Sequence, residues 1–300
     1  MRVLVTGASG FVGSSLVSFL LSKGHDVRGL VRRRDTTPGS DDIEWEPAEM
    51  RIDSPALEGF EAVVHLAGES ITGRWTAAKK RRIRDSRVQG TRLLAATLVG
   101  LKRRPKVLVS ASATGYYGDR GAKLLDEESP AGQGFLPEVC RAWEEATAAA
   151  AAAGIRVVCL RIGMVIGANG GSLARMLTPF RAGIGGVIGD GSQYWSWIAL
   201  EDLNAAILRL ISDESISGAA NAVSPYPATN HQFTKTLGRV LSRPTIFALP
   251  ELAVKVALGE MAEAVLLASA RVAPSRLTAA GFSFQYPALE SAFRRALHGP

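Results

Sequence analysis

The chain has 300 residues, of which 47% are hydrophobic, and its 35 basic and 28 acidic side chains give a formal net charge of +7. This length and hydrophobicity allow a large buried core in one domain or two. No apolar run reaches membrane-spanning length, and the strand-like start MRVLVTG lacks the basic and apolar regions of a signal peptide. We therefore expect a cytoplasmic protein with no membrane partner.

Metal sites and nucleic-acid binding are not expected either. The two cysteines cannot form a disulfide framework, and the four histidines are isolated from the cysteines and from one another. The basic cluster KKRRIRDSR, residues 79–87, has a charge that suits nucleic acid, but no reader motif accompanies it and a solvated helix face also explains it. The sequence does not indicate an oligomeric state.

The first predicted elements are a strand over residues 2–7 and a helix over residues 11–22. Between them, TGASGFVG places Gly7, Gly10 and Gly13 where the strand turns into the helix. Such glycines let the backbone reverse, let a pyrophosphate approach and let helix pack on strand, while the helix N-terminus offers N–H groups to phosphates. The predicted cofactor residues of this turn are Gly7, Ser9, Gly10, Phe11, Val12 and Gly13. The alternative is a glycine-rich turn without a ligand.

The second predicted strand, residues 26–32, ends in a run of arginines. An acidic side chain at that strand end would bond the adenosine ribose of NAD, whereas arginine pairs with the 2′-phosphate of NADP. Arg32 and Arg33 are the candidates, and Asp35 is expected in the following loop. These residues predict NADP as the cofactor; the alternative is a solvated arginine run.

A short strand near residues 43–47 and a stronger strand over 62–68, AVVHLAG, come next. Ligands of parallel sheets bind at the carboxyl ends of the strands. The backbone of Leu66, Ala67 and Gly68 is therefore predicted to line the adenosine or ribose site. For His65, which lies at the same strand end, we expect a packing or hydrogen-bonding role.

A long helix over about residues 77–98 follows that strand. It carries Arg82 and Arg87, which are predicted to grip a phosphate or a ribose of the cofactor. For both arginines the alternative is a solvated helix face.

The next elements are a strand over residues 106–113, a helix over 137–153 and a buried strand over 155–167. Met164 falls at the end of that last strand, near the expected position of nicotinamide. The alternation of strands and helices predicts the α/β class, with a Rossmann-type doubly wound parallel sheet covered on both faces.

After residue 165 the pattern changes to glycine-rich loops around a short helix, an amphipathic helix over 201–211, and short helices broken by prolines. We expect residues 1–165, with 195–224 returning to them, to form an NADP-binding domain. Residues 166–300 are expected to form a smaller, mostly helical C-terminal cap that meets the substrate.

Four motifs carry a family resemblance: the glycine turn, HLAGE, the serine-rich strand end SASATGYYG, and WIALEDL after a glycine-rich loop. Together they resemble the extended short-chain dehydrogenase/reductase superfamily, which includes nucleotide-sugar epimerases. TGYYGD, CRAWEEA and LRIGMVIGANGGSLARMLTPF are similar to an atypical, epimerase-like subfamily of nucleoside-diphosphate-sugar epimerases. The resemblance covers essentially the whole chain, including a C-terminal segment over residues 248–297 that most extended members lack.

The resemblance implies hydride transfer between nicotinamide and a substrate carbon, with a tyrosine that moves the proton. A lysine four residues later binds the nicotinamide ribose and lowers the pKa of the tyrosine. In FLPEVCRAWEEA, aligned on Glu144, this pair falls on Leu136 and Cys140, neither of which can replace its counterpart. The asparagine often found on the preceding helix falls on Arg87, and only the substrate-orienting serine is kept, at Ser112.

Three interpretations of this loss stay open. The chemistry could be rebuilt from nearby groups, with Ser112, Tyr117 and Tyr116 as the candidate catalytic residues. Cys140 is a further proton donor unless it is an apolar filler. The chain could instead be a reductase that takes its proton from water or ribose, or a non-catalytic NADP-binding sensor or regulatory protein.

The predicted cap offers a site for a small-molecule substrate. Its loop GANGGSLARM, with Arg175 or Arg181, would hold a diphosphate, and Tyr194 and nearby tryptophans would stack on a base or sugar. A lid with structural tryptophans is the alternative. The prediction is thus an NADP-dependent, epimerase-like oxidoreductase of atypical mechanism, acting on a sugar or a nucleotide-sugar-like compound.

Overall fold

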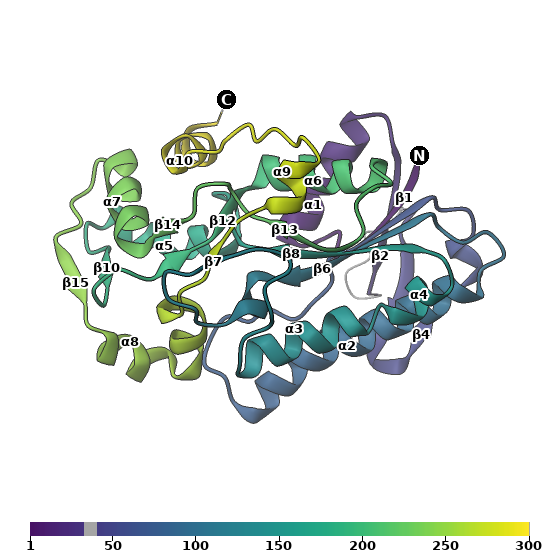
Figure 1. Ribbon diagram of the computed structural model, residues 1–300, viewed down its shortest axis with the longest axis horizontal. Coiled ribbons are helices and arrows are strands. Elements are labelled where there is room, and N and C mark those ends of the chain that lie inside the picture. Colours follow the sequence, from purple (N-terminus) through teal and green to yellow (C-terminus); the bar gives the residue numbers. More distant parts are fainter. Residues whose placement is uncertain (33–40, 300) are drawn as a thin grey trace.

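The computed structural model describes residues 1–32 and 41–299. Its centre is an eight-stranded sheet with the strand order β13-β8-β6-β5-β1-β2-β3-β4 (Figure 1). Every neighbouring pair is parallel except β3 and β4. The strands are β1 (Arg2–Thr6), β2 (Asp26–Val31), β3 (Ile43–Glu46), β4 (Arg51–Ile52), β5 (Ala62–His65), β6 (Val107–Ala113), β8 (Arg156–Ile162) and β13 (Gly218–Ala222). The predicted doubly wound, Rossmann-type α/β class is confirmed.

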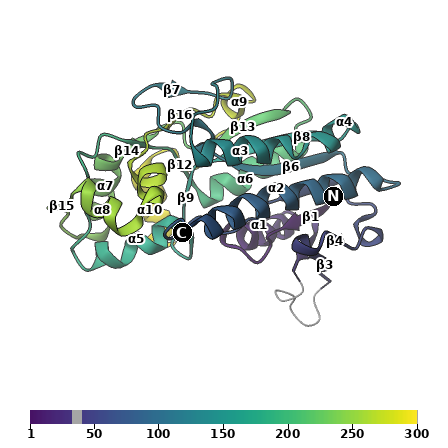
Figure 2. The same ribbon diagram turned by 90° about the horizontal axis from the view of Figure 1, so that it is seen from below.

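Helices cover both faces of the sheet, as Figures 1 and 2 show. On one face lie α1 (Phe11–Ser22) and α6 (Leu200–Ser212), and on the other lie α2 (Ala77–Gly100), α3 (Phe135–Glu145) and α4 (Ala148–Ala152). Along β6, Val107 and Val109 join the core under α1 and α6, whereas Leu108 joins the core under α2. Because both faces are buried, the strands are almost continuous apolar runs. No helix in the described ranges is long and apolar enough to cross a bilayer.

Two predicted elements are each divided in the structure. The helix expected over residues 137–153 is α3 followed by α4, and at the break the Thr147 hydroxyl donates to the Glu144 carbonyl oxygen (2.7 Å). The strand expected over 155–167 is β8 followed by β9 (Met164–Ile166), which pairs with β12 (Trp197–Ala199) outside the main sheet. Gly163 permits this turn, since a Cβ there would lie 2.6 Å from the Ser196 carbonyl oxygen.

A smaller region lies beside the sheet, and we call it the cap. It contains α5 (Gly171–Arg181), α7 (Asn230–Leu241), α8 (Glu251–Leu258), α10 (Leu289–His298) and two short ladders, β10 (Gly186–Ile188) with β15 (Phe247–Leu249) and β11 (Tyr194–Trp195) with β14 (Ala228–Thr229). Trp195, Trp197, Phe233 and Phe293 are buried in its core, where the Phe233 ring meets the rings of Trp195 and Phe293 edge to face. Both tryptophans therefore have a structural role in the cap.

The C-terminal segment also returns to the body of the sheet. Leu277 of α9 (Ser275–Ala279) lies in the core beneath β13, and β16 (Arg271–Val272) pairs with β7 (Leu124–Leu125). Met261, just before the π-helix η5 (Ala262–Leu267), packs in a cluster with Trp75 and Leu136. A segment around Met261, in the last third of the sequence, thus covers the amino ends of α2 and α3.

Candidate functional site

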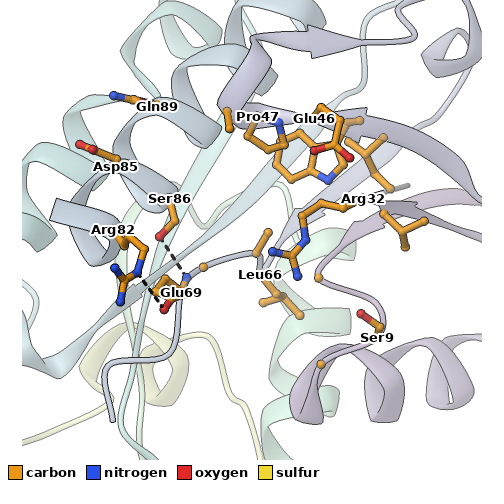
Figure 3. Close-up of a pocket in the computed structure, with 18 of the residues that line it drawn as sticks. Ser9, Arg32, Glu46, Pro47, Leu66, Glu69, Arg82, Asp85, Ser86 and Gln89 are labelled. Carbon is orange, nitrogen blue, oxygen red and sulfur yellow. Dashed lines mark hydrogen bonds and ion pairs between the residues drawn. The ribbon is translucent and has the colours of Figure 1, made fainter. Parts of the chain in front are cut away.

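A cavity of about 740 Å³ lies at the carboxyl ends of β1, β2 and β5, where the strand order reverses around β1 (Figure 3). Ligands of open α/β sheets bind at such a point. The predicted cofactor residues that line the cavity are Gly7, Ser9, Gly10, Arg32, Leu66, Ala67, Gly68 and Arg82. The topology therefore brings residues from three strand ends and from α2 to one site.

Other lining residues were missed by the sequence analysis. They are Leu30, Val31, Trp45, Glu46, Pro47, Ala48, Glu69, Ser70, Asp85, Ser86 and Gln89. Three of them share with Arg82 the spacing of a single helix face, so the sequence could have predicted Asp85, Ser86 and Gln89. The wall formed by residues 45–48 could not be predicted from local sequence, because its position depends on the pairing of β3 with β2.

The glycine turn is built for close contacts. Gly7 has a φ of +68°, and a Cβ on it would lie 3.0 Å from the Ala67 backbone nitrogen. A Cβ on Gly13 would lie 2.1 Å from the Gly7 carbonyl oxygen, so only glycine lets α1 pack on the turn. The first turn of α1 has neither a side-chain cap nor an acidic residue. Its N–H groups and positive dipole end therefore suit phosphate oxygens.

The remaining predicted cofactor residues lie elsewhere. The Phe11 ring points to the cap, where a Cβ on Gly170 would lie 2.5 Å from it. Val12 packs against the core, and Met164 packs against the cap core. Arg87 does not line the cavity: its guanidinium carbon lies 5.0 Å from the centroid of the Trp143 ring, and its Nη1 donates to the Glu69 carbonyl oxygen at 2.9 Å. Arg33 lies outside the described residues.

His65 fixes the loop that follows β5. The Thr6 hydroxyl oxygen accepts hydrogen bonds from the backbone nitrogens of Leu66 and Ala67, each at 3.1 Å. Its hydrogen is left for His65 Nδ1 at 2.7 Å, so Nε2 carries the ring proton and donates to Thr91 Oγ1 at 2.9 Å. Burial lowers the pKa of His65 to about 4, which keeps the ring neutral. His65 therefore has the hydrogen-bonding role expected from the sequence.

Charged groups stand on both sides of the cavity. Figure 3 shows Arg32 and Arg82 approaching it from opposite sides, with Glu69 near Arg82. Glu69 Oε1 lies 2.7 Å from Lys79 Nζ and 3.7 Å from Arg82 Nε, and the hydrogen bond from Lys79 lowers the pKa of Glu69. The described residues contain no group of three or more His, Cys, Asp or Glu arranged to hold a metal ion.

The helix face that carries Leu136, Cys140 and Glu144 has three separate roles. Leu136 packs in the apolar cluster with Trp75 and Met261. Burial, followed by the charge of Glu144, raises the pKa of Cys140 to about 12, so this residue stays a neutral thiol. Glu144 points to the sheet, where it accepts a hydrogen bond from Ser112 Oγ (2.6 Å).

Glu144 also anchors a buried polar network that we call the Arg161 network: Ser112, Tyr117, Glu144, Arg161 and Asn221. Arg161 Nε and Nη2 each lie 2.9 Å from a Glu144 oxygen, and Arg161 Nη1 donates to the Tyr117 hydroxyl oxygen at 3.0 Å. The Tyr117 hydroxyl lies 2.8 Å from Asn221 Oδ1 and from the Asp126 carbonyl oxygen. Burial raises the pKa of Tyr117 to about 12. Two of the three candidate catalytic hydroxyls, those of Ser112 and Tyr117, are thus bonded within the protein.

Tyr116 differs from its neighbour. It lies in the short 3-10 turn η4 (Thr114–Tyr117) directly after β6 and is only partly buried. The Arg161 guanidinium carbon lies 3.5 Å from the centroid of its ring, which fixes the ring over the Arg161 network. No described residue forms a hydrogen bond with its hydroxyl group.

A sequence signal for the Arg161 network existed. Ser112, Arg161 and Asn221 are register partners on adjacent strands β6, β8 and β13. Each is a polar residue near the carboxyl end of a mostly apolar run, VLVSASA, VVCLRI or GAANA. That these three side chains lie on the same face of the sheet follows from the strand register, which cannot be inferred from the sequence of one strand alone.

Comparison with known proteins gives two family matches. Residues 3–223 match the NAD dependent epimerase/dehydratase family, and residues 249–296 match a domain of unknown function, DUF1731. An epimerase family protein of Mycobacterium leprae, ML0860, is 40% identical over 299 residues, which is 99% of this chain and 96% of that protein.

Solved structures agree over the whole chain. The crystal structure of human epimerase family protein SDR39U1 (isoform 2) with NADPH has a TM-score of 0.89 and 32% identity, with all of both chains covered. The nucleoside-diphosphate sugar epimerase of Corynebacterium glutamicum has a TM-score of 0.82 and 38% identity over 99% of this chain and 58% of that chain.

Proposed function

The chain belongs to the NAD dependent epimerase/dehydratase family, and on that premise we propose that it binds NADPH and reduces a carbonyl group of a small sugar-like compound. The observation that carries the proposal is the cavity at the reversal of strand order, with the uncapped end of α1 at one wall and Arg32 at another. The NADPH in the structure of human SDR39U1 supports the choice of cofactor.

The residues present fit a phosphorylated dinucleotide. The N–H groups of the first turn of α1 would hold the diphosphate, and Gly13 keeps that approach open. Arg32, with Arg33 beside it in sequence, would bind the 2′-phosphate on the adenosine ribose. Leu66, Ala67 and Gly68 would line the cofactor along the end of β5, and Met164 would border the nicotinamide. Residues 1–165 and 195–224 would form this cofactor domain, and residues 166–300 the substrate side.

NADPH would supply the hydride, and the protein would supply the proton. We assign the proton donor to Tyr116, because its hydroxyl group lies outside the hydrogen bonds of the Arg161 network. The carbonyl carbon would receive the hydride and the carbonyl oxygen would receive the Tyr116 proton, which solvent then replaces. Ser112 and Tyr117 would position the Arg161 network beneath the Tyr116 ring. Since the step needs a carbonyl group, the preferred substrate class is a nucleoside-diphosphate sugar whose sugar ring carries a ketone; the name of the C. glutamicum relative supports the nucleoside-diphosphate part.

Two measurements test this function. Fluorescence titration should show tighter binding of NADPH than of NADH, and Arg32→Ala should remove that preference by weakening NADPH about 10- to 100-fold. NADPH consumption should then be followed with a panel of sugar ketones and nucleotide sugars. Tyr116→Phe should slow turnover at least about 100-fold without changing NADPH affinity. The control Tyr226→Phe, at a tyrosine exposed on the surface, should leave turnover unchanged. Equal affinity for the two coenzymes would refute the assignment of Arg32.

One observation favours a second function, that of a non-catalytic NADPH sensor. The positions of Leu136 and Cys140 on α3 hold no proton-donating hydroxyl group and no cation. The Phe11 ring joins the glycine turn to the glycine-rich loop of the cap. NADPH binding would then be transmitted to the cap through Phe11. Hydrogen exchange should show NADPH-dependent protection of residues 167–171 with no NADPH consumption, and Tyr116→Phe should leave that response unchanged.

A further inference from the structure

The cap presents a large apolar surface to solvent. Strand β15 and helix α8 lie at the end of the cap away from the eight-stranded sheet (Figures 1 and 2). More than half of the exposed large apolar side chains of the described residues gather there, each between 40% and 79% exposed. We call them the apolar patch: Ile184, Ile246, Phe247, Leu249, Leu252 and Val256. Single exposed apolar residues are ordinary, but a contiguous group of this size is typical of an interaction site.

Helix α8 contributes an apolar face that nothing in the described chain covers. Its sequence, ELAVKVAL, is apolar at six of its eight positions. Val254 is buried against the cap core, whereas Leu252, Ala253, Val256 and Ala257 are exposed. A helix that is apolar on all sides is normally enclosed by protein. The exposed side of α8 therefore indicates a partner.

Strand β15 contributes an open edge. It pairs with β10 in a two-stranded sheet, and its other edge has no strand partner among the described residues. The Leu249 carbonyl oxygen accepts a hydrogen bond from the Gly189 nitrogen on the β10 side (2.9 Å). Backbone groups alternate in direction along a strand, so the N–H and C=O of Ala248 face the open edge. An uncharged, exposed edge such as IFAL is a template for pairing with another chain.

The open edge is complementary to a second copy of itself. When two β15 strands run antiparallel about a two-fold axis at Ala248, the two Ala248 residues exchange both N–H···O bonds. Phe247 of each copy then lies opposite Leu249 of the other, in the closely spaced kind of cross-strand pair. Pro250 has no N–H to donate, so the pairing ends after this short segment and cannot extend along the chain.

The size of the apolar patch suits a dimer. Large apolar side chains present on the order of 150–200 Å² each when fully exposed, so the exposed fractions of the patch amount to roughly 600 Å². A standard interface buries about 800 Å² on each partner, and in homodimers about 65% of it is apolar. The patch can therefore supply the apolar part of such an interface.

The charges of this surface also permit self-association. A two-fold axis places a surface against its own copy, so an unpaired charge near the axis would repel its equivalent. The charged residues of α8, Glu251 and Lys255, lie 4.0 Å apart and cancel each other. No charge lies within β15 itself.

We propose that the apolar patch is the interface of a two-fold dimer of this chain, in which the two β15 strands pair at Ala248 and the exposed sides of α8 are buried. None of the patch residues lines the cavity, so each copy keeps its candidate site open. The proposal is therefore independent of the proposed function.

The mass of the protein in solution tests the proposal. Light scattering behind size-exclusion chromatography should give twice the monomer mass for the parent at micromolar concentrations. The double variant Leu252→Glu with Val256→Glu should weaken the dimer at least about 100-fold and elute as a monomer. Leu21→Glu, at an exposed apolar position of α1, is the matched control and should remain a dimer. Circular dichroism should show the parent's melting curve for the control and a folded double variant.

Cross-linking tests the position of the two-fold axis. In the proposed dimer the two Ala248 residues face each other, so Ala248→Cys should be joined to its copy by a short bismaleimide. The two native cysteines are buried and should not react. Leu21→Cys, at the control position, should give no cross-linked dimer.

The outcomes decide the proposal. A parent that is monomeric at micromolar concentrations would overturn it, because the patch would then meet a different partner. A dimer that persists in the double variant, or that leaves Ala248→Cys without a cross-link, would place the interface elsewhere and would also overturn it. If the double variant does not fold, the cross-linking result alone supports or refutes the interface.

Discussion

Glu144 on α3 and Arg161 on β8 form a bidentate ion pair, in which two N–O distances are each 2.9 Å. Their side chains are 15% and 5% exposed, so the pair lies almost entirely out of water. It ties α3 to the strand whose neighbours carry Ser112 and Asn221, and it supports the Tyr116 ring. The helix face that carries Leu136 and Cys140 thus has a structural anchor one turn later, at Glu144.

Removing one partner of this pair should be costly. Glu144→Leu or Arg161→Met alone should lower the free energy of unfolding by about 3–5 kcal/mol, because the other charge is left buried and unpaired. The double variant should cost less than the sum of the two. Denaturant unfolding of the four proteins measures this, with Glu145→Leu, an exposed neighbour on α3, as a control within about 0.5 kcal/mol of the parent. Additive single effects would show that the pair is not coupled.

The contact between Gly13 and Gly7 should tolerate no side chain. Gly13→Ala places a Cβ 2.1 Å from the Gly7 carbonyl oxygen, so α1 must shift away from the turn. We expect a loss of stability of about 1–3 kcal/mol and a weaker NADPH complex, measured by thermal unfolding and fluorescence titration. Gly100→Ala is the matched control, since nothing lies within 4 Å of its added Cβ and alanine favours the helix. A Gly13→Ala protein that binds NADPH normally would contradict the assigned site.

Stability should fall in mild acid because of His65. An unfolded histidine binds its proton below a pH of about 6.5, whereas folded His65 has a pKa of about 4. Between these values the unfolded state binds more protons, so the free energy of unfolding falls as the pH falls, by about 3 kcal/mol in total. His65→Gln should be less stable at pH 7.5, because the pair with Thr6 is altered, and should show a smaller loss between pH 7 and pH 4.5. Exposed His231→Gln should keep the parent's profile.

Both cysteines should resist alkylation in the folded protein. Burial raises the pKa of Cys140 and of Cys159 to about 12, so only a very small thiolate fraction exists at pH 8. Mass spectrometry after iodoacetamide treatment should find both thiols unmodified in native protein and modified in guanidinium chloride. Rapid native alkylation of Cys140 would return it to the set of candidate proton donors.

The cavity in which we propose that the cofactor binds was largely predictable from local sequence. A glycine turn between a first strand and a first helix, arginine at the end of the next strand, and AVVHLAG are short-range patterns whose geometry is set within a few residues. For this reason the sequence predicts Gly7, Gly10, Arg32 and Gly68 as site residues, and all four line one cavity. The cavity wall formed by residues 45–48 is not predictable in this way, because its position depends on the pairing of β3 with β2.

The reacting half depended on tertiary structure. The sequence, through its resemblance to the extended short-chain dehydrogenase/reductase superfamily, predicts that Leu136 and Cys140 stand where a tyrosine and a lysine are usual. It did not determine which tyrosine is enclosed, since Tyr116 and Tyr117 are adjacent in the chain and only strand register places Arg161 and Asn221 around one hydroxyl. The contacts of the Arg87 side chain likewise depend on tertiary structure, because its partners Trp143 and Glu69 lie on α3 and in the loop after β5. Such contacts join residues far apart in sequence, and their energies depend on burial, which no local pattern specifies.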